Sequence, residues 1–234
     1  SGERAPPSAP PHRVARVGAA ARSNNPRAAL ALLDGAWLRC RDERDRATLL
    51  ADLEAQGPRL NSVALSLWDW AEVGYQEVKS SALLQDTLQD AGFRVTPGVA
   101  GMPTAFVAEY GEGGPVLGIL AEFDALPGIT QTASPERMLR QDRQAGHACG
   151  HHLFGTGSVG AAIALKNLMA ERGLPGRLRV YGTPAEEGGS GKVYMVRAGL
   201  FEDADVVLHW HAAARNAATP ATSLANKSAR VRFY

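Results

Sequence analysis

From residue 104 onward, short apolar runs rich in β-forming residues alternate with segments of helical periodicity. Strands are expected at Thr104–Tyr110, Val116–Phe123, Arg177–Tyr181 and Asp205–Trp210, and helices at Thr156–Ala170 and Lys192–Ala198. The run Val116–Phe123 is almost entirely apolar, as in a strand that is buried on both faces. Elements that alternate at these spacings predict an α/β fold, a three-layer αβα sandwich around a mostly parallel (mixed) sheet.

The first part of the chain has a different composition. Residues 1–27 are rich in Ala, Pro, Ser and Arg and lack aromatic residues, so we expect a disordered tail. The Arg-rich start also resembles a transit sequence, although its prolines would break an amphipathic helix. Helical periodicity then runs, with breaks, from Ala28 to Asp69, and a second helix is expected at Glu77–Ala91, ending before Gly92.

Bulk composition excludes several classes of function. Hydrophobic residues make up 45% of the 234-residue chain and charged residues 21%, which is enough apolar material for a globular core. A formal net charge of +1 gives no electrostatic reason to expect nucleic acid or an anionic membrane as a partner. No stretch approaches a membrane span. With only two cysteines, a disulfide scaffold is not expected, and the cytoplasm is the expected location.

Metal-binding side chains are concentrated in one part of the sequence. Five of the six histidines lie between His147 and His211. Cys149 and His151 are two residues apart in GHACGHH, and in an extended segment both side chains would point the same way and share one ion. The alternative is a buried structural cysteine beside a core histidine. The density of polar groups disfavours this alternative, because burying them without a ligand is costly.

Two adjacent carboxylates, Glu186 and Glu187, follow the strand expected at Arg177–Tyr181. Alone, such a pair is more often solvated at a helix N-terminus. Beside a cluster of thiol and imidazole groups, one carboxylate can be a metal ligand while the other is the general base for a water that the metal activates.

Further candidates lie at the ends of the other expected strands. Asp124 follows Val116–Phe123 and could bridge two ions, orient a ligand imidazole, or bind turn amides. Glu122 is a weaker candidate. His209 and His211 share one face of the last strand, and we favour His211 as a ligand because it is nearer the strand end. In parallel sheets, ligands bind beyond the carboxyl ends of strands, so these positions agree with a common site.

Three other motifs are incomplete. GTGSVG at 155–160 has no preceding strand, GGSGKV at 188–193 lacks the first glycine and the final Ser/Thr of a phosphate loop, and Ser190 fails the G-x-S-x-G pattern. Catalysis by a Cys149 nucleophile with a histidine would leave the glutamate pair without a role.

The motifs AEFDALPG, GHACGHH, GTPAEEGGSGK and DVVLHWH together resemble the metallopeptidase family of aminoacylases, carboxypeptidase G-type enzymes and amino-acid-conjugate amidohydrolases. The resemblance extends from about Leu60 to Tyr234 and implies a zinc-peptidase-like fold. It makes Cys149, His151, Glu187 and His211 metal ligands and Glu186 the catalytic base, with Asp124 bridging or orienting. It also implies two divalent ions, zinc or manganese.

Two departures from the family pattern affect these expectations. His152 stands where relatives carry Asn or Asp. The chain also stops at Tyr234, before the family's lid domain is complete, so residues 28–220 are expected to form the catalytic domain and residues 221–234 the first strand of a truncated lid.

The resulting hypothesis is a metallo-amidohydrolase that cleaves the amide of an N-acyl or N-aminobenzoyl amino acid, with oligomerisation through the lid. The alternatives are a dipeptidase or aminoacylase of the same family, or a metal-binding polypeptide without activity. We expect the 234-residue chain alone to be inactive.

Overall fold

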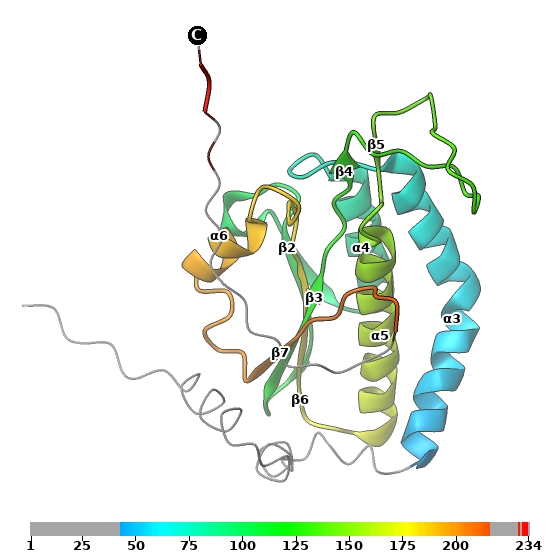
Figure 1. The fold of residues 1–234 in the computed structure, drawn as a ribbon. Helices are drawn as coiled ribbons and strands as arrows, with labels where there is room; N and C mark the ends of the chain where they lie inside the picture. The colour runs from blue at the N-terminus through cyan, green and yellow to red at the C-terminus, as the bar shows by residue number, and fades with distance from the viewer. Residues whose placement is uncertain (1–42, 216–228, 230, 234) are drawn as a thin grey trace, which may run out of the picture.

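A mixed β-sheet lies at the centre of the molecule, with helices on both of its faces (Figure 1). The computed structural model describes residues 43–215, 229 and 231–233. Within them the main sheet has five strands in the order β1-β2-β6-β3-β7. Their bounds are β1 Arg94–Pro97, β2 Phe106–Glu112, β6 Gly176–Gly182, β3 Val116–Ala121 and β7 Val206–Leu208. Strands β6, β3 and β7 run parallel, whereas β1 and β2 join in antiparallel pairings. The predicted α/β class is confirmed, with a sheet that is only partly parallel.

The helices form the two outer layers. On one face lie α3 (Glu43–Trp70), α4 (Val78–Asp90) and α5 (His151–Arg172), and α5 packs directly on β3 and β6. On the other face, α6 (Gly191–Arg197) lies against the short 3-10 helix η1 (Val99–Gly101). The three layers of the predicted sandwich are therefore present in the described residues.

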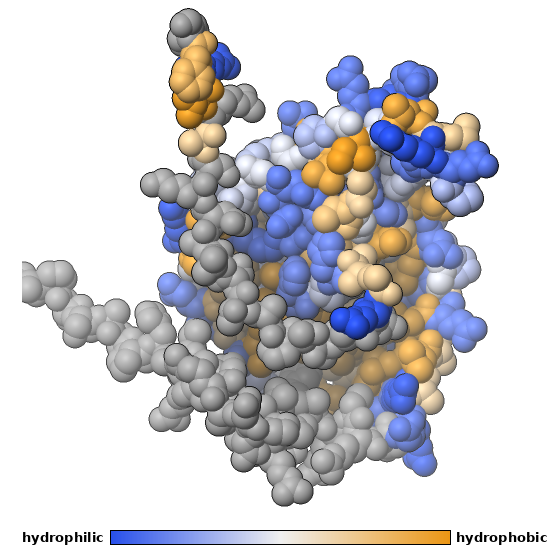
Figure 2. All heavy atoms as spheres, in the orientation of Figure 1, coloured by the Kyte–Doolittle hydropathy of each residue, from blue (hydrophilic) through white to orange (hydrophobic). Residues whose placement is uncertain are grey.

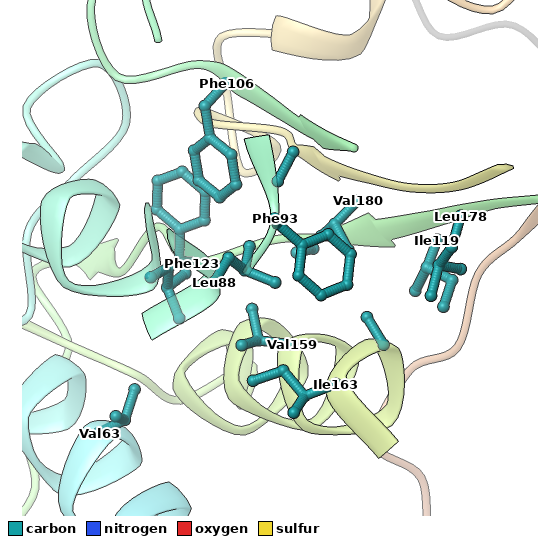
Figure 3. Close-up of a cluster of buried hydrophobic side chains, with 14 of the residues drawn as sticks. Val63, Leu88, Phe93, Phe106, Ile119, Phe123, Val159, Ile163, Leu178 and Val180 are labelled. Atoms are coloured by element: carbon teal, nitrogen blue, oxygen red, sulfur yellow. The ribbon is translucent and has the colours of Figure 1, made fainter. Parts of the chain in front are cut away.

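The main hydrophobic core lies between the sheet and the three long helices (Figure 3). Phe106 from β2 stacks on Phe123, with ring centroids 6.1 Å apart, and both side chains are fully buried. Val159 and Ile163 of α5 close the core from the helical side. Each such side chain contributes about 1.5–3 kcal/mol when it is removed from water. A smaller cluster around Tyr181 and Met195 fills the opposite face, beneath α6.

Most element boundaries lie within two residues of those predicted, except at the start of α5, and strand β1 was not predicted. Helix α5 begins at His151 rather than Thr156. Its glycines lower helix propensity, yet packing requires one of them, since a Cβ at Gly155 would lie 2.7 Å from the carbonyl oxygen of Glu122. Strand β7 covers only Val206–Leu208 and is exposed, because it is paired on one side alone among the described residues.

Helix α5 is long and apolar enough to meet the length and composition of a membrane span, contrary to the expectation from the sequence. Its apolar side chains pack on the sheet and on α3, so burial in the core explains this composition.

A long excursion leaves the domain after β3. Its two ends form the antiparallel pair β4 (Leu126–Pro127) and β5 (Ala145–Gly146), which encloses residues 128–144. In Figure 1 this loop lies beyond the end of α3, at the same edge of the sheet as the start of α5. The predicted tail at residues 1–27, the helical segment before Glu43 and most of residues 221–234 lie outside the described residues.

Candidate metal centre

Segments that are distant in sequence meet at one edge of the sheet. Because β3, β6 and β7 are parallel, their carboxyl ends lie at the same edge. Asp124 follows β3, Glu186 and Glu187 follow β6, and His211 follows β7. Helix α5 starts at this edge with His151. The structure therefore brings together all the residues that were proposed for the site from the sequence.

His151 lies at the centre of this group and is fully buried. Its Nδ1 donates a hydrogen bond to Asp124 Oδ1 at 2.9 Å, which leaves the lone pair on Nε2. Nε2 lies 3.9 Å from Oε1 of Glu187, and neither buried atom makes a hydrogen bond in the described part of the chain, although Oε2 of Glu122 lies 3.1 Å from Nε2. One cation bound to both would span this separation, because metal–ligand bonds to nitrogen and oxygen are each about 2 Å long.

Cys149 and His211 complete this set of potential ligands. Cys149 Sγ lies 3.3 Å from His211 Nε2, and the ligand atoms of Cys149, His151 and His211 all lie within 4.8 Å of one another. Burial, followed by the hydrogen bond to the Glu187 carboxylate, raises the pKa of the Cys149 thiol to about 11. A cation among these groups would reverse this effect, because a coordinated thiol loses its proton.

The geometric reason expected for pairing Cys149 with His151 was wrong. They do not lie in one extended segment: Gly150 has a left-handed backbone (φ 81°) and His151 opens α5. The turn, rather than strand alternation, brings the two side chains to one site. His209 and His211 likewise lie beyond the end of β7 rather than on a strand face.

Glu122 forms a second focus of charge. It is 2% exposed, and its carboxylate forms an ion pair with Lys192. It also lies 3.1 Å from His151 Nε2 and 3.4 Å from His209 Nε2. Glu122, His151 and Glu186 form an alternative group of ligand atoms within 4.8 Å. His209 therefore lies beside Glu122, whereas His211 lies beside Cys149.

The two carboxylates after β6 differ in exposure. The Glu186 side chain is 44% exposed, whereas that of Glu187 is 19% exposed. The backbone N–H of Glu187 donates to Asp124 Oδ2 at 2.9 Å. Glu187 therefore lies inward, toward the potential ligands, and Glu186 lies where a substrate can reach it. The assignment of Glu186 as base and Glu187 as ligand stays a prediction.

Sequence reasoning missed Glu77, which holds the loop that carries this pair. Glu77 is fully buried; its Oε1 accepts a hydrogen bond from the Ala185 N–H at 2.8 Å, and its Oε2 accepts one from the Thr104 hydroxyl at 3.1 Å. Ala185 has φ 56°, an unusual conformation for a residue with a side chain. Tyr75 donates a further hydrogen bond to the Gly189 carbonyl. The only signal in the sequence was a carboxylate preceding a helix.

His147 and His152 lie outside the group of potential ligands. Their ring centroids are 5.1 Å apart, and His147 Nε2 donates to the Leu67 carbonyl at 3.0 Å. Burial, and then the proximity of His152, lowers the pKa of His147 to about 4, so this imidazole is neutral at pH 7.

The chain was compared with families of known proteins. Residues 118–222 match the model of peptidase family M20/M25/M40, and they contain all six of the predicted site residues. This part of the chain is an M20 peptidase domain.

Relatives of this M20 domain act on several substrates. One of the subunits of p-aminobenzoyl-glutamate hydrolase from Escherichia coli is 42% identical over 184 residues, which cover 77% of this chain and 38% of that protein. The human Xaa-Arg dipeptidase is 33% identical over 201 residues, which cover 78% of this chain and 42% of that protein. The chain therefore spans about two fifths of the length of these relatives.

Solved structures share the fold of this domain. A dinuclear metal-binding peptidase of the M20 family from Bacillus subtilis is 29% identical, with a TM-score of 0.58, and the match covers 66% of this chain and 42% of that one. An aminobenzoyl-glutamate utilization protein from Klebsiella pneumoniae shares the fold, with 18% identity, a TM-score of 0.53, and coverage of 68% of this chain and 45% of that one.

The residues of the M20 domain fit a divalent ion. Thiol, imidazole and carboxylate groups converge. Two buried ligand atoms, His151 Nε2 and Glu187 Oε1, make no hydrogen bond among residues 43–215, and the Glu122 carboxylate lies 3.1 Å from Nε2. This donor set suits a borderline-soft ion.

Proposed function

We propose that the protein is a metal-dependent amidohydrolase that cleaves the amide bond of an N-acyl amino acid, with a p-aminobenzoyl-glutamate-like amide as substrate. The observation that carries the proposal is the convergence of Cys149, His151 and His211, whose ligand atoms lie within 4.8 Å of one another, beside Glu187 and the exposed Glu186. The 42% identity to a p-aminobenzoyl-glutamate hydrolase supports the choice of substrate.

In this proposal, Cys149, His151, Glu187 and His211 would hold the divalent metal. We propose two ions, either zinc or manganese. When bound, the metal polarises the amide carbonyl and lowers the pKa of water. Asp124 orients the His151 ring by accepting the hydrogen bond from Nδ1, which leaves the lone pair of Nε2 for the metal that these residues would hold. Glu122 and Lys192 balance each other's charge beside it.

Glu186 supplies the proton chemistry. Its carboxylate lies 3.9 Å from His151 Nε2 and is partly exposed, so it can contact both the site and a bound substrate. It takes a proton from the water that attacks the amide carbon, and then gives that proton to the departing nitrogen. Breaking the C–N bond releases a carboxylic acid and an amine, and Glu186 returns to its ionised state.

The test compares Glu186→Gln with Glu171→Gln in the full-length protein. Glu171 is an exposed glutamate at the opposite end of α5 and serves as a matched control. We expect Glu186→Gln to lower kcat by at least about 100-fold, the contribution typical of a general base, with metal content by mass spectrometry unchanged. Turnover equal to that of the Glu171 variant would remove Glu186 as the base.

A second candidate function is a dipeptidase, favoured by the 33% identity to the human Xaa-Arg dipeptidase. Assays of p-aminobenzoyl-glutamate and an Xaa-Arg dipeptide with the same preparation distinguish the two. Metal binding without hydrolysis of either substrate would favour an inactive metal-binding polypeptide. Oligomerisation through the lid stays a prediction.

A further inference from the structure

A cavity of about 400 Å³ lies between the excursion 128–144 and the end of α3. Its lining includes Trp68 from α3, Ile129 and Leu139 from the excursion, and His147, which lies two residues before Cys149. The volume lies within the range of about 300–1,000 Å³ that is usual for small-molecule sites. His147 and Ala148 line the cavity and lead directly into Cys149, and the cavity is large enough for part of a substrate.

The wall formed by the excursion is fixed in place by ion pairs. Arg140 and Arg143 each contact Asp69 Oδ1 at 3.0 Å, and Asp69 lies at the end of α3. Arg140 also forms a two-point contact with Asp142 and lies over the Trp68 ring, 5.4 Å from its centroid. These arginines are paired with carboxylates, so they serve to hold the excursion against α3 and to shape the cavity.

Apolar side chains lie unusually exposed around the cavity. Ile129 is 45% exposed and Leu139 is 58% exposed, although both line the same cavity as the Trp68 indole. At the upper right of Figure 2, where the excursion lies in Figure 1, apolar atoms lie beside strongly polar ones. These apolar groups suit an apolar part of a bound molecule, although Gln131 and Arg137 also line the cavity.

One buried hydrogen-bond acceptor on the lining is unused. His147 is 8% exposed, and its Nε2 donates to the Leu67 carbonyl, which leaves Nδ1 as an acceptor. This Nδ1 is buried and has no partner within the described ranges. A buried polar atom without a partner costs free energy, and a donor on a bound molecule would remove that cost.

We propose that this cavity is the subsite for the acyl group of the substrate, and that it selects an aromatic acyl group whose ring carries an N–H or O–H donor. The proposal rests on the proposed function, which supplies the amide bond. Trp68, Ile129 and Leu139 contact the ring, and His147 Nδ1 accepts the hydrogen bond from its substituent. A 4-aminobenzoyl group has both features.

Calorimetry on the metal-loaded protein tests the subsite without catalysis. The probes are 4-aminobenzamide, benzamide without the ring donor, and cyclohexanecarboxamide without the aromatic ring. We expect 4-aminobenzamide to bind about fivefold more tightly than benzamide, as one added hydrogen bond allows, and cyclohexanecarboxamide to bind most weakly. Equal affinities for the three, or no saturable binding, would overturn the proposal.

Two leucine variants provide the matched control. Leu139→Ser should weaken binding of 4-aminobenzamide about fivefold, through lost apolar contact. Leu65→Ser changes an equally exposed leucine on α3 that does not line the cavity, and should have no effect. If the two variants behave alike, Leu139 does not contact the ligand and the subsite is wrong.

Assays of 4-aminobenzoyl-glutamate hydrolysis separate this inference from the proposed function. Binding that Leu139→Ser weakens, without hydrolysis, would support the subsite and refute the reaction. Hydrolysis with the same KM in Leu139→Ser and the unchanged protein would support the reaction and refute the subsite.

Discussion

Replacing Glu77 tests whether the loop that carries the carboxylate pair must be held in place for metal binding. In Glu77→Ala, the Ala185 N–H and the Thr104 hydroxyl lose their acceptor, and both residues are 3% exposed or less. Each unpaired buried group costs about 1–3 kcal/mol. Removing a buried carboxylate offsets part of this cost, since burial is the main cause that raises the pKa of Glu77. We expect a net loss of about 2–4 kcal/mol in the free energy of unfolding.

The effect on metal affinity follows from the backbone of Ala185. Its left-handed conformation costs roughly 1–3 kcal/mol and persists only where the surroundings impose it. Without Glu77 the loop can relax, and Glu186 and Glu187 are no longer preorganised. We expect zinc affinity to fall about 10- to 100-fold, as when other groups that support metal ligands are removed. Glu77→Gln keeps an acceptor for the Ala185 N–H and adds a donor toward the Thr104 hydroxyl. The zinc affinity of this variant should therefore change less than about threefold.

Zinc affinity is measured by competition with a chromophoric chelator, and stability by urea unfolding of the metal-free protein. Glu72→Ala is the control, because Glu72 accepts hydrogen bonds from Lys79 and Ser80 at the start of α4 and does not contact the loop. This variant should lower stability without lowering zinc affinity. If Glu77→Ala binds zinc as tightly as the unchanged protein, the loop does not depend on Glu77. If Glu72→Ala loses as much affinity, the effect reflects general destabilisation.

Four further changes test other parts of the structure. Chelation should lower the melting temperature in a scanning measurement, because metal that binds only the folded state stabilises it; an unchanged melting temperature would contradict bound metal. Gly189→Ala should lower zinc affinity, since its Cβ would overlap the Tyr75 ring, whereas Gly188→Ala has nothing within 4 Å and should not. In urea, Gly160→Ala should lose stability, because its Cβ would lie 2.7 Å from the Leu60 side chain. Burial raises the pKa of Glu77 in the folded protein above 4.5, so the contribution of Glu77 to stability is present at low pH and is lost as pH rises through the folded pKa. Glutamine does not titrate. The free energy of unfolding of Glu77→Gln, relative to that of the unchanged protein, should therefore increase from pH 4 to pH 7.

The alternation of strands and helices could be predicted because each element has its own period of apolar residues. The prediction failed where local propensity and packing conflict. The glycines near the start of α5 are poor helix formers, yet Gly155 lies too close to the Glu122 carbonyl for any side chain. Tertiary packing therefore requires a glycine at a helical position where local propensity disfavours one. The excursion 128–144 has no such period, and long-range ion pairs such as Arg140–Asp69 hold it. Such pairs leave no local pattern.

The meeting of Asp124, Glu187 and His211 could be predicted from topology, because parallel strands end at the same edge of the sheet. The residues that support this meeting could not. Glu77 contacts Ala185 across 108 positions, and Lys192 reaches Glu122 from a different element. Neither contact can be predicted from spacing along the chain. The hydrogen-bond partners of a buried carboxylate come from distant segments that meet only in the folded protein.

Asp124 shows how the geometry narrows a choice that the sequence left open between bridging two ions, orienting a histidine and binding turn amides. One oxygen accepts the hydrogen bond from His151 Nδ1, and the other accepts the backbone N–H of Glu187. Both oxygens therefore already have donors, which favours orientation over a bridging role. The same two bonds hold the His151 ring and the backbone at Glu187, whose Oε1 lies 3.9 Å from His151 Nε2. One residue at the end of β3 thus couples the start of α5 to the loop after β6.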